Sequence, residues 1–456
     1  MGETVVDESA IIAGLERALA RVGKGRPSGL KRLTGGAMME SSRFESDGEA
    51  YVLRRAPSME FMEGRPFGHA DEAAIVQAAH DAGVSAPNVL VVLEEADGLG
   101  SGFVMEALAG TPDPRAILAM ETPALLLEDA ARDLARIHSL GPADVPDAVS
   151  TMDYGAAVAG LKQQFEDAGG DRPIVALGLA WLADNLPEPV EPVMCHGDFR
   201  LGNILADKGR LTGVLDWEIV HFGDPHEDLA FACLPVWRFG RVDRPAMGLG
   251  SLETFFAAYE DESGRTVDRA RFDFWMIYRT VWWALGCLRQ GHVWRSGEDR
   301  MVERVVISRR ASEQEVDLLL LLEEMAPREE RQRPLPDAAP KRAEPRGESS
   351  AGEIAAAVSE WLATLKDKIE GHDRFQLAVA RNALGIVTRE EETRPDPHDR
   401  ALAQAILAGE QGLATQGLLA SLKRQALDTL AADIPKYSML AVARDKWGDT
   451  TPQGER

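Results

Sequence analysis

The chain has 456 residues, of which 45% are hydrophobic and 27% charged, and its formal net charge is −24 at pH 7. This composition is ordinary for a soluble globular protein of two or three domains, and the negative charge disfavours nucleic acid and anionic membranes as partners. No apolar run approaches the ~20 residues of a membrane helix, the start MGETVVDESA lacks the pattern of a signal peptide, and the scattered cysteines indicate a reducing compartment. We therefore expect a cytoplasmic protein.

The first 108 residues alternate between helical and strand patterns. Apolar residues recur at helical spacing over 7–22 and again over 71–82. Apolar and polar residues alternate over 30–53, which predicts a hairpin around Gly35-Gly36 and Ser41-Ser42. Further strands are expected over 50–56, 87–95 and 101–108.

Longer helices are expected next, over 126–140, 154–165 and 173–185. They precede the stretch 194–218, MCHGDFRLGNILADKGRLTGVLDWE, in which a short apolar lead and a second apolar run predict the two strands of a hairpin. The polar residues of this stretch carry the main indication of function.

Two carboxylates and one amide belong to this predicted hairpin. Asn203 stands five residues after Asp198, and Asp216 lies in the second apolar run. Phosphoryl transfer from a nucleotide requires such a set, because a carboxylate must accept the proton of the acceptor hydroxyl and oxygen ligands must hold Mg²⁺. The separation of Asp198 and Asn203 is that of the base and the metal-binding Asn in the protein-kinase catalytic loop. Arg200 could offset the charge of the transferring phosphoryl group.

Residues in and just after this stretch also have alternative roles. His196 with Asp198 would also suit half of a metallohydrolase site, but the further His or carboxylate ligands are missing from the sequence. Glu218 could bind the metal or be purely structural. Asp228 could hold the loop by hydrogen bonds or simply place a charge at a helix start.

The region resembles the signature of the aminoglycoside phosphotransferase and choline kinase-like superfamily, in a form similar to the branch linked to acyl-CoA dehydrogenases. The resemblance covers roughly the first seven-tenths of the chain. It implies an α+β, bilobal protein kinase-like fold, with a mixed β-sheet N-lobe at 1–108 and a mainly helical C-lobe at 109–325. The residues that carry it are His196-Gly197-Asp198, Asn203, Asp216-Trp217-Glu218, Gly223-Asp224-Pro225 and Asp228-Leu229-Ala230.

The resemblance also implies ATP, or GTP, and Mg²⁺ as cofactors, with the metal on Asn203 and Asp216. Arg54 would replace the phosphate-binding Lys of the kinase plan and pair with Glu72. Alternation along the strand leaves open whether Arg54 or Arg55 points inward, and the resemblance favours Arg54. The other expected nucleotide contacts are Gly35, Gly36, Ser41 and Ser42 over the phosphates, and backbone groups near Glu106 and Leu108 at the adenine.

The acceptor site of this superfamily would lie at residues 234–252. Arginines in this segment could recognise an anionic acceptor, such as a coenzyme A phosphate or a carboxylate, or could be ordinary surface residues. The aromatic residues that follow are dense enough to form core, yet some could wall the acceptor pocket. The candidate acceptor residues are Arg238, Arg241, Arg244, Trp275 and Trp282.

A charged, proline-rich segment at 326–350 predicts a linker. It would lead to an all-helical domain at 351–456, in which FQLAVARNALGIVTREEE resembles an uncharacterised small helical domain. An exposed apolar face on these helices would favour a homo-oligomer. No catalytic cluster appears in this part of the sequence.

The function expected is ATP-dependent, or GTP-dependent, phosphorylation of a hydroxyl group on a small metabolite, such as a hydroxyacyl-CoA or a related anionic acceptor. One alternative is an aminoglycoside- or macrolide-type antibiotic phosphotransferase. Another is a non-catalytic nucleotide-binding scaffold that acts through its C-terminal helices. The identity of the acceptor is not decided by the sequence.

Overall fold

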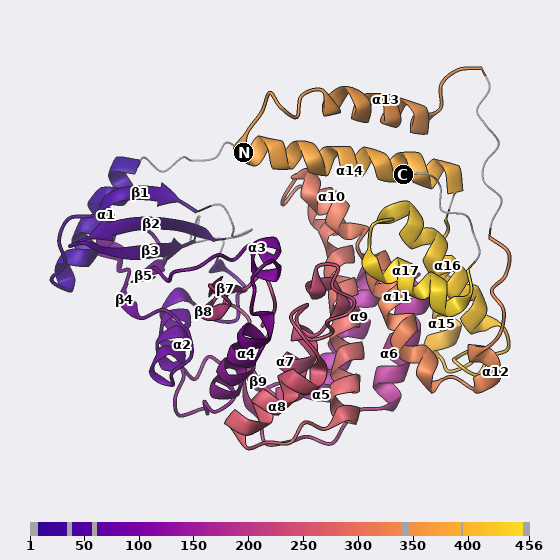
Figure 1. Cartoon of the computed structure of the whole chain (residues 1–456), viewed down its shortest axis with the longest axis horizontal. Coiled ribbons are helices and arrows are strands. Elements are labelled where there is room, and N and C mark those ends of the chain that lie inside the picture. Colours follow the sequence, from indigo (N-terminus) through magenta and orange to yellow (C-terminus); the bar gives the residue numbers. More distant parts are fainter. Residues whose placement is uncertain (1–7, 34–38, 57–61, 339–346, 394, 450–456) are drawn as a thin grey trace.

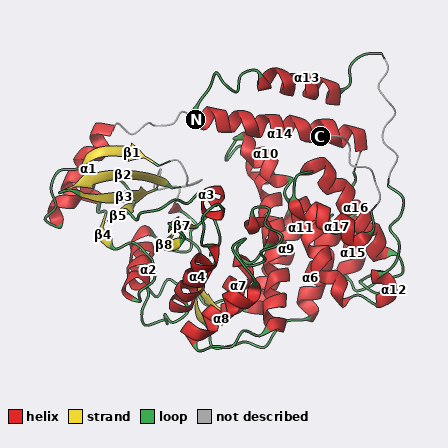
Figure 2. Cartoon of the chain, in the orientation of Figure 1, coloured by secondary structure: helices red, strands yellow, loops and turns green. Residues whose placement is uncertain are grey.

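The computed structural model describes residues 8–33, 39–56, 62–338, 347–393 and 395–449. A small lobe built on a β-sheet lies beside a larger helical lobe, and the C-terminal helices cover the far side and the top of the larger lobe (Figure 1). Helices predominate, and the strands are confined to the small lobe and to short ladders among the helices of the larger lobe (Figure 2). The fold is thus bilobal and of the α+β class, as expected.

The N-lobe sheet has five antiparallel strands in the order β1-β2-β3-β5-β4. Helix α1 packs its apolar face, including Leu15 and Leu19, against Phe44 and Leu53 of the sheet. The expected hairpin over 30–53 is in fact three strands, so Ser41 and Ser42 lie within a strand instead of at a turn. The elements are α1 (Glu8–Arg21), β1 (Ser28–Arg32), β2 (Glu40–Ser46), β3 (Glu49–Arg55), α2 (His69–Asp81), β4 (Val89–Val92) and β5 (Gly102–Glu106).

The C-lobe surrounds two short ladders that carry the motif residues. The prediction of one hairpin from 193–195 and 211–217 was wrong, because β6 pairs with β9 and β8 pairs with β7. A tight turn, with positive φ at Lys208 and Gly209, brings β8 back onto its nearest neighbour in the chain. The strands are β6 (Val193–Cys195), β7 (Ile204–Asp207), β8 (Arg210–Val214) and β9 (His221–Gly223).

Helices form the rest of the C-lobe around a long central helix, α9. None of the helices among the described residues combines the length and the hydrophobicity needed to cross a membrane. The helices are α3 (Pro114–Leu118), α4 (Pro123–Ile137), α5 (Tyr154–Asp167), α6 (Pro173–Asp184), α7 (Pro225–Ala232), α8 (Leu252–Ser263), α9 (Arg269–Ser296), α10 (Val302–Ser308) and α11 (Ala311–Leu322).

Three of the C-terminal helices share one hydrophobic core with the C-lobe. Helix α15 packs on α6, and α16 and α17 pack on α11. Buried Lys423 of α16 pairs with Glu323 at 2.6 Å. The hairpin of α13 and α14 instead lies at the edge of the molecule, above α10 (Figure 1). The C-terminal elements are α12 (Arg328–Arg331), α13 (Ala351–Ala363), α14 (Gly371–Thr393), α15 (Arg400–Leu407), α16 (Leu418–Asp433) and α17 (Ser438–Trp447).

Candidate active site

The loop 196–203 leaves the end of β6 and is shaped by its first residues. His196 is fully buried, and its ring centroid lies 4.7 Å from that of Trp217. Gly197 has φ +80°, and a Cβ there would approach the carbonyl oxygen of Ile219 to 2.7 Å. Only glycine fits this close approach. The ring and the glycine together fix where Asp198 emerges from the loop.

Asp198 is bonded by two other residues of the same loop. Asn203 Nδ2 donates to Asp198 Oδ2 at 2.5 Å and to the Asp198 carbonyl at 3.1 Å. Arg200 Nε donates to Asp198 Oδ1 at 2.7 Å. The guanidinium of Arg200 also lies over the ring of Trp237, 4.3 Å from its centroid. The three loop residues singled out from the sequence therefore meet at one point.

Asp228 of α7 holds the start of the loop by hydrogen bonds. Its carboxylate accepts hydrogen bonds from the backbone N–H groups of His196 and Gly197, at 2.6 and 2.8 Å, and lies 3.2 Å from His138 Nε2. Burial alone would raise the pKa of Asp228, but the bond from His138 and the loop N–H groups lower that pKa to about 2. Of the two readings given for Asp228, the structure has the hydrogen-bonding one.

Arg279 holds the same loop from the opposite side, and the sequence analysis did not find it. Its Nη2 donates to the Gly197 carbonyl at 2.8 Å and lies 2.9 Å from Glu227 Oε1. The guanidinium lies between the rings of Phe231 and Trp282, at 4.7 and 4.9 Å from their centroids. The sequence did contain a signal, because Arg279 is a single cation within the apolar and aromatic run of α9. A charge buried in such a run needs polar partners.

A second group of charges faces the loop from the N-lobe. Arg54 Nε donates to Glu72 Oε1 at 2.8 Å, and Arg54 Nη2 lies 3.2 Å from Asp216 Oδ1 and 2.5 Å from Glu218 Oε1. Arg55 points to the other face of β3, where it bonds the Leu99 carbonyl. The expected pairing of Arg54 with Glu72 is therefore present. Burial raises the pKa of Glu72 to about 7 despite the charge of Arg54.

The oxygen atoms of this group suit a hard divalent cation. Burial, followed by the negative charges of Glu218 and Asp198, raises the pKa of Asp216 to about 6 against the opposing effect of Arg54. Crowded carboxylates of this kind are relieved by a cation. Asn203 directs its amide nitrogen at Asp198, so the amide oxygen of Asn203 remains available as a further metal ligand. A set made only of carboxylate and amide oxygens fits Mg²⁺, so Asn203, Asp216 and Glu218 could hold that ion.

The expected nucleotide contacts in the N-lobe are placed in part. Gly35 and Gly36 lie outside the described residues. Ser41 and Ser42 stand on β2, with Ser41 directly opposite Arg54 of β3.

At the junction of the lobes, the backbone N–H of Glu106 donates to the Asn88 carbonyl at 2.9 Å, so that N–H is already used within the lobe. A Cβ on Gly213 of β8 would lie 2.8 Å from Leu108 Cδ1, so the Leu108 side chain covers the hairpin of β7 and β8.

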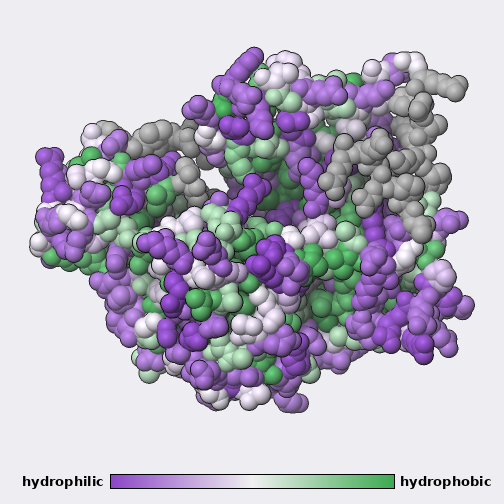
Figure 3. All heavy atoms as spheres, in the orientation of Figure 1, coloured by the Kyte–Doolittle hydropathy of each residue, from purple (hydrophilic) through white to green (hydrophobic). Residues whose placement is uncertain are grey.

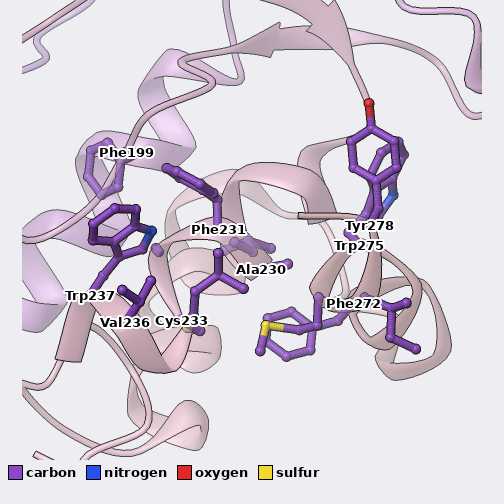
Figure 4. Packing of buried hydrophobic residues seen from close by; sticks show 14 of the residues in the cluster. Phe199, Ala230, Phe231, Cys233, Val236, Trp237, Phe272, Trp275 and Tyr278 are labelled. Carbon is purple, nitrogen blue, oxygen red and sulfur yellow. The ribbon is translucent and has the colours of Figure 1, made fainter. Parts of the chain in front are cut away.

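The expected acceptor residues do not all reach the loop. Trp275 is completely buried and packs edge-on against Tyr154, Phe274 and Tyr278, so its assignment to a pocket wall was wrong. Figure 4 shows it beside Tyr278. Helix α9 is surrounded by protein at this level, and an aromatic ring there fills core. Trp282 is partly exposed but lies on Arg279.

The arginines of the segment 234–252 each have a protein partner. Arg238 donates from Nε and Nη2 to the Cys233 carbonyl, at 3.0 and 2.7 Å. Arg241 and Arg244 both pair with Asp243.

Two aromatic side chains that contact the loop 196–203 were missed from the sequence. Trp237 supports Arg200, as described above, and Phe239 approaches the loop at Gly202, where a Cβ would lie 4.0 Å from its Cζ. Phe239 is 44% exposed and has φ +48°. The sequence analysis assigned the acceptor site to the neighbouring arginines and gave no role to Trp237 or Phe239.

Family models match two parts of the chain. A model described as "Phosphotransferase enzyme family" matches residues 29–275, and one described as "Domain of unknown function (DUF6285)" matches residues 367–437. The second match agrees with the small helical domain expected from the sequence.

Curated relatives are of two kinds. The chain is 30% identical over 271 residues to acyl-CoA dehydrogenase family member 11 of Gallus gallus, a match that covers 55% of this chain and 34% of that protein. It is 30% identical over 240 residues to family member 10 of Mus musculus, covering 46% of this chain but 21% of that protein. The chain therefore spans only a minor part of these two relatives. An aminoglycoside 3'-phosphotransferase of Streptomyces fradiae is 28% identical over 262 residues, which cover 54% of this chain and 88% of that enzyme.

Two phosphotransferases are among the solved structures with partial similarity to the chain. A macrolide 2'-phosphotransferase of Brachybacterium faecium gives a TM-score of 0.47 at 18% identity and covers 66% of this chain and 97% of its own. A thermostable mutant of aminoglycoside phosphotransferase APH(4)-Ia, in complex with AMP-PNP and hygromycin B, gives a TM-score of 0.46 at 20% identity, with coverages of 66% and 96%.

Proposed function

The chain belongs to the phosphotransferase enzyme family and is a small-molecule kinase, and from this premise we propose that it transfers the γ-phosphoryl group of ATP, or of GTP, to a hydroxyl group of a small anionic metabolite. The observation that carries the proposal is the meeting of Asp198, Arg200 and Asn203 in one hydrogen-bonded loop beside Asp216. This is the arrangement that phosphoryl transfer needs.

Each residue has a distinct part in the proposed reaction. Asp198 orients the acceptor hydroxyl and takes its proton on a carboxylate that also accepts hydrogen bonds from Arg200 and Asn203. Asn203 and Asp216 would hold Mg²⁺, which when bound neutralises charge on the nucleotide phosphates. Arg54 binds the phosphates from the N-lobe, and Arg200 stabilises the transferring group.

The side chains around Asp198 favour an anionic acceptor. The loop presents Arg200 on the ring of Trp237, with exposed Phe239 beside it. A cation next to aromatic rings suits a carboxylate or phosphate attached to an apolar body, such as a hydroxyacyl-CoA. An aminoglycoside is a polycation and would be better bound by carboxylates. The match to the Streptomyces enzyme nevertheless makes an antibiotic the second candidate.

Nucleotide turnover tests this function directly. Release of ADP or GDP is measured with Mg²⁺ and a panel of hydroxyacyl-CoAs, hydroxy acids, amino alcohols and antibiotics, for the wild type and for Asp198→Ala. Acceptor-dependent release that vanishes in the variant supports the proposal and names the acceptor class. Binding of nucleotide with no turnover in either protein would favour a scaffold, and turnover that survives in the variant would exclude Asp198 as the base.

We further propose that two copies pair through α13. Ile354, Val358 and Trp361 follow one another at spacings of four and three residues and are 57%, 42% and 61% exposed. They therefore form one apolar stripe on α13. Hydrophilic residues, by contrast, cover much of the molecular face drawn in Figure 3. A single apolar stripe is self-complementary across a two-fold axis.

A further inference from the structure

Arg65, which received no role from the sequence, crosses from the N-lobe to the C-lobe. It lies between β3 and α2, and its Nη1 donates to Glu218 Oε2 at 2.6 Å. Both side chains are largely buried, at 17% and 15% exposure. Glu218 in turn stands two residues after Asp216. The contact therefore joins the segment before α2 to the proposed metal site.

Two arginines share this one carboxylate. Arg54 Nη2 lies 2.5 Å from Glu218 Oε1, while Arg65 takes Oε2, so each oxygen of Glu218 has its own cation. The two charges lower the pKa of Glu218 against the effect of burial. Both arginines come from the N-lobe and converge where the phosphates of a nucleotide between the lobes would lie.

The balance of charge in this group changes when a divalent cation binds. Arg54 and Arg65 face the three carboxylates of Glu72, Asp216 and Glu218. With all five ionised, the group carries one excess negative charge, which repels a polyphosphate. A divalent cation on the carboxylates reverses the sign to one excess positive charge. It also competes with the arginines for the same oxygens.

The start of α2 fixes the segment that carries Arg65. His69 Nδ1 lies 2.8 Å from Ser101 Oγ, beside the first residue of β5. His69 is buried, and burial together with the charges of Arg54 and Arg65 lowers its pKa to about 4. The imidazole is therefore neutral at pH 7 and adds no third cation. Arg65 lies only four residues from this anchor, which keeps its guanidinium close to the site.

We propose that Arg65 is a second phosphate-binding residue, which rests on Glu218 in the free protein and moves to the nucleotide phosphates when Mg²⁺ occupies Glu218 and Asp216. The inference depends on the proposed kinase function. The planar guanidinium suits both partners, because it binds carboxylate and phosphate oxygens with the same paired donors.

Equilibrium binding tests the proposal without any need for an acceptor. Dissociation constants for Mg-ATP and for adenosine are measured by calorimetry for the wild type, Arg65→Ala and Arg65→Lys. The matched control is Arg43→Ala, because Arg43 is an exposed arginine of β2 whose ion pair within the described part of the chain is with Glu45 of the same strand. Loss of a charge-assisted contact predicts that Arg65→Ala weakens Mg-ATP by about tenfold or more. Adenosine binding should not change, and the Lys variant should lie between the two.

The possible outcomes separate the inference from the function on which it depends. Equal Mg-ATP affinity in the wild type and Arg65→Ala would overturn the inference alone. The inference would also be overturned if Arg65→Ala weakened the binding of adenosine as much as that of Mg-ATP, because that result indicates a merely structural role for Arg65. A wild type that binds no Mg-ATP would overturn the proposed function as well. If Arg65→Ala proves unfolded, Arg65→Gln, which can still bond Glu218, gives the same comparison.

Discussion

Asn203 and Asp198 are joined side chain to side chain by a 2.5 Å hydrogen bond that closes the loop between them. The bond orients the proposed base, and it also fixes which end of the Asn203 amide faces a metal. One residue thus serves two parts of the proposed reaction.

Asn203→Ala should therefore lower kcat and raise the Mg²⁺ concentration needed for half-maximal activity. Replacing a metal ligand or its hydrogen-bonding partner typically costs about 10- to 100-fold. The measurement is turnover titrated with Mg²⁺. Asn185→Ala is the control, because that amide only bonds the Trp181 carbonyl at the exposed end of α6. An unchanged Mg²⁺ requirement in Asn203→Ala would argue against the ligand role.

Because Asp317 on α11 is buried, the free energy of unfolding should fall as the pH rises. Burial, with a contribution from Glu313, raises its pKa from 3.8 to about 8, although Tyr437 and Arg238 oppose the shift. The folded protein therefore keeps this proton at pH 7, while the unfolded chain releases it. The associated stability is complete below about pH 4 and is lost as the pH rises through 8.

Asp317→Asn should remove that dependence and be the more stable protein at pH 9. Urea unfolding of both proteins at pH 5, 7 and 9 measures the difference. Asp261→Asn, at an exposed position of α8, controls for the change of one charge. Parallel pH profiles for Asp317→Asn and the wild type would contradict the assignment.

Lys423 should be essential for the packing of α16. It is 2% exposed and is paired with Glu323 at 2.6 Å, so Lys423→Ala would take the buried cation from that carboxylate and leave it with Lys446, which lies 2.7 Å from its other oxygen and is 42% exposed. A broken buried pair costs about 3 to 5 kcal/mol in the free energy of unfolding. Chemical denaturation measures this loss, with exposed Lys436→Ala as the control. A cost below about 1 kcal/mol, the usual value for a surface pair, would mean that the pair is solvated.

Trp361→Glu should convert a dimer to a monomer. The substitution places a charge at the C-terminal end of the apolar stripe on α13, where the Trp361 ring is 61% exposed. Light scattering after size-exclusion chromatography measures the mass of both proteins. Ser359→Glu on the same helix is the matched charge control. A monomeric wild type, or a dimer that survives Trp361→Glu, would exclude pairing through this stripe.

Two residues of the predicted site that lie together in the structure, Asp198 and Asn203, have a local spacing. Asp198 and Asn203 come from one loop, and their separation along the chain already limits their distance in space. Arg54 and Glu72 were paired from the plan of a related fold, and the side chains do meet. The predictions of the family and of the bilobal fold were both based mainly on the stretch 194–218, and the family model matches residues 29–275.

The residues that were missed or misplaced depend on contacts between distant segments. Arg279 reaches Gly197 across 82 residues, and Arg65 reaches Glu218 across 153. No periodicity within a window reports such a contact. Trp275 was assigned to a pocket because α9 is apolar on several sides, and spacing alone cannot tell which side meets protein. The predicted pairing of strand 193–195 was wrong for the same reason, since its partner β9 lies beyond the stretch 194–218.

The core that α15, α16 and α17 share with α6 and α11 has a practical consequence for how the kinase is studied. A gene fragment ending near residue 325 looks like a natural catalytic unit, because the motif and the family match both end before it. Such a fragment would expose a large apolar surface on α6 and α11, where these helices had been, and would tend to aggregate in the expression host. Any inactivity it showed would then reflect poor folding, and would be mistaken for regulation by the missing segment.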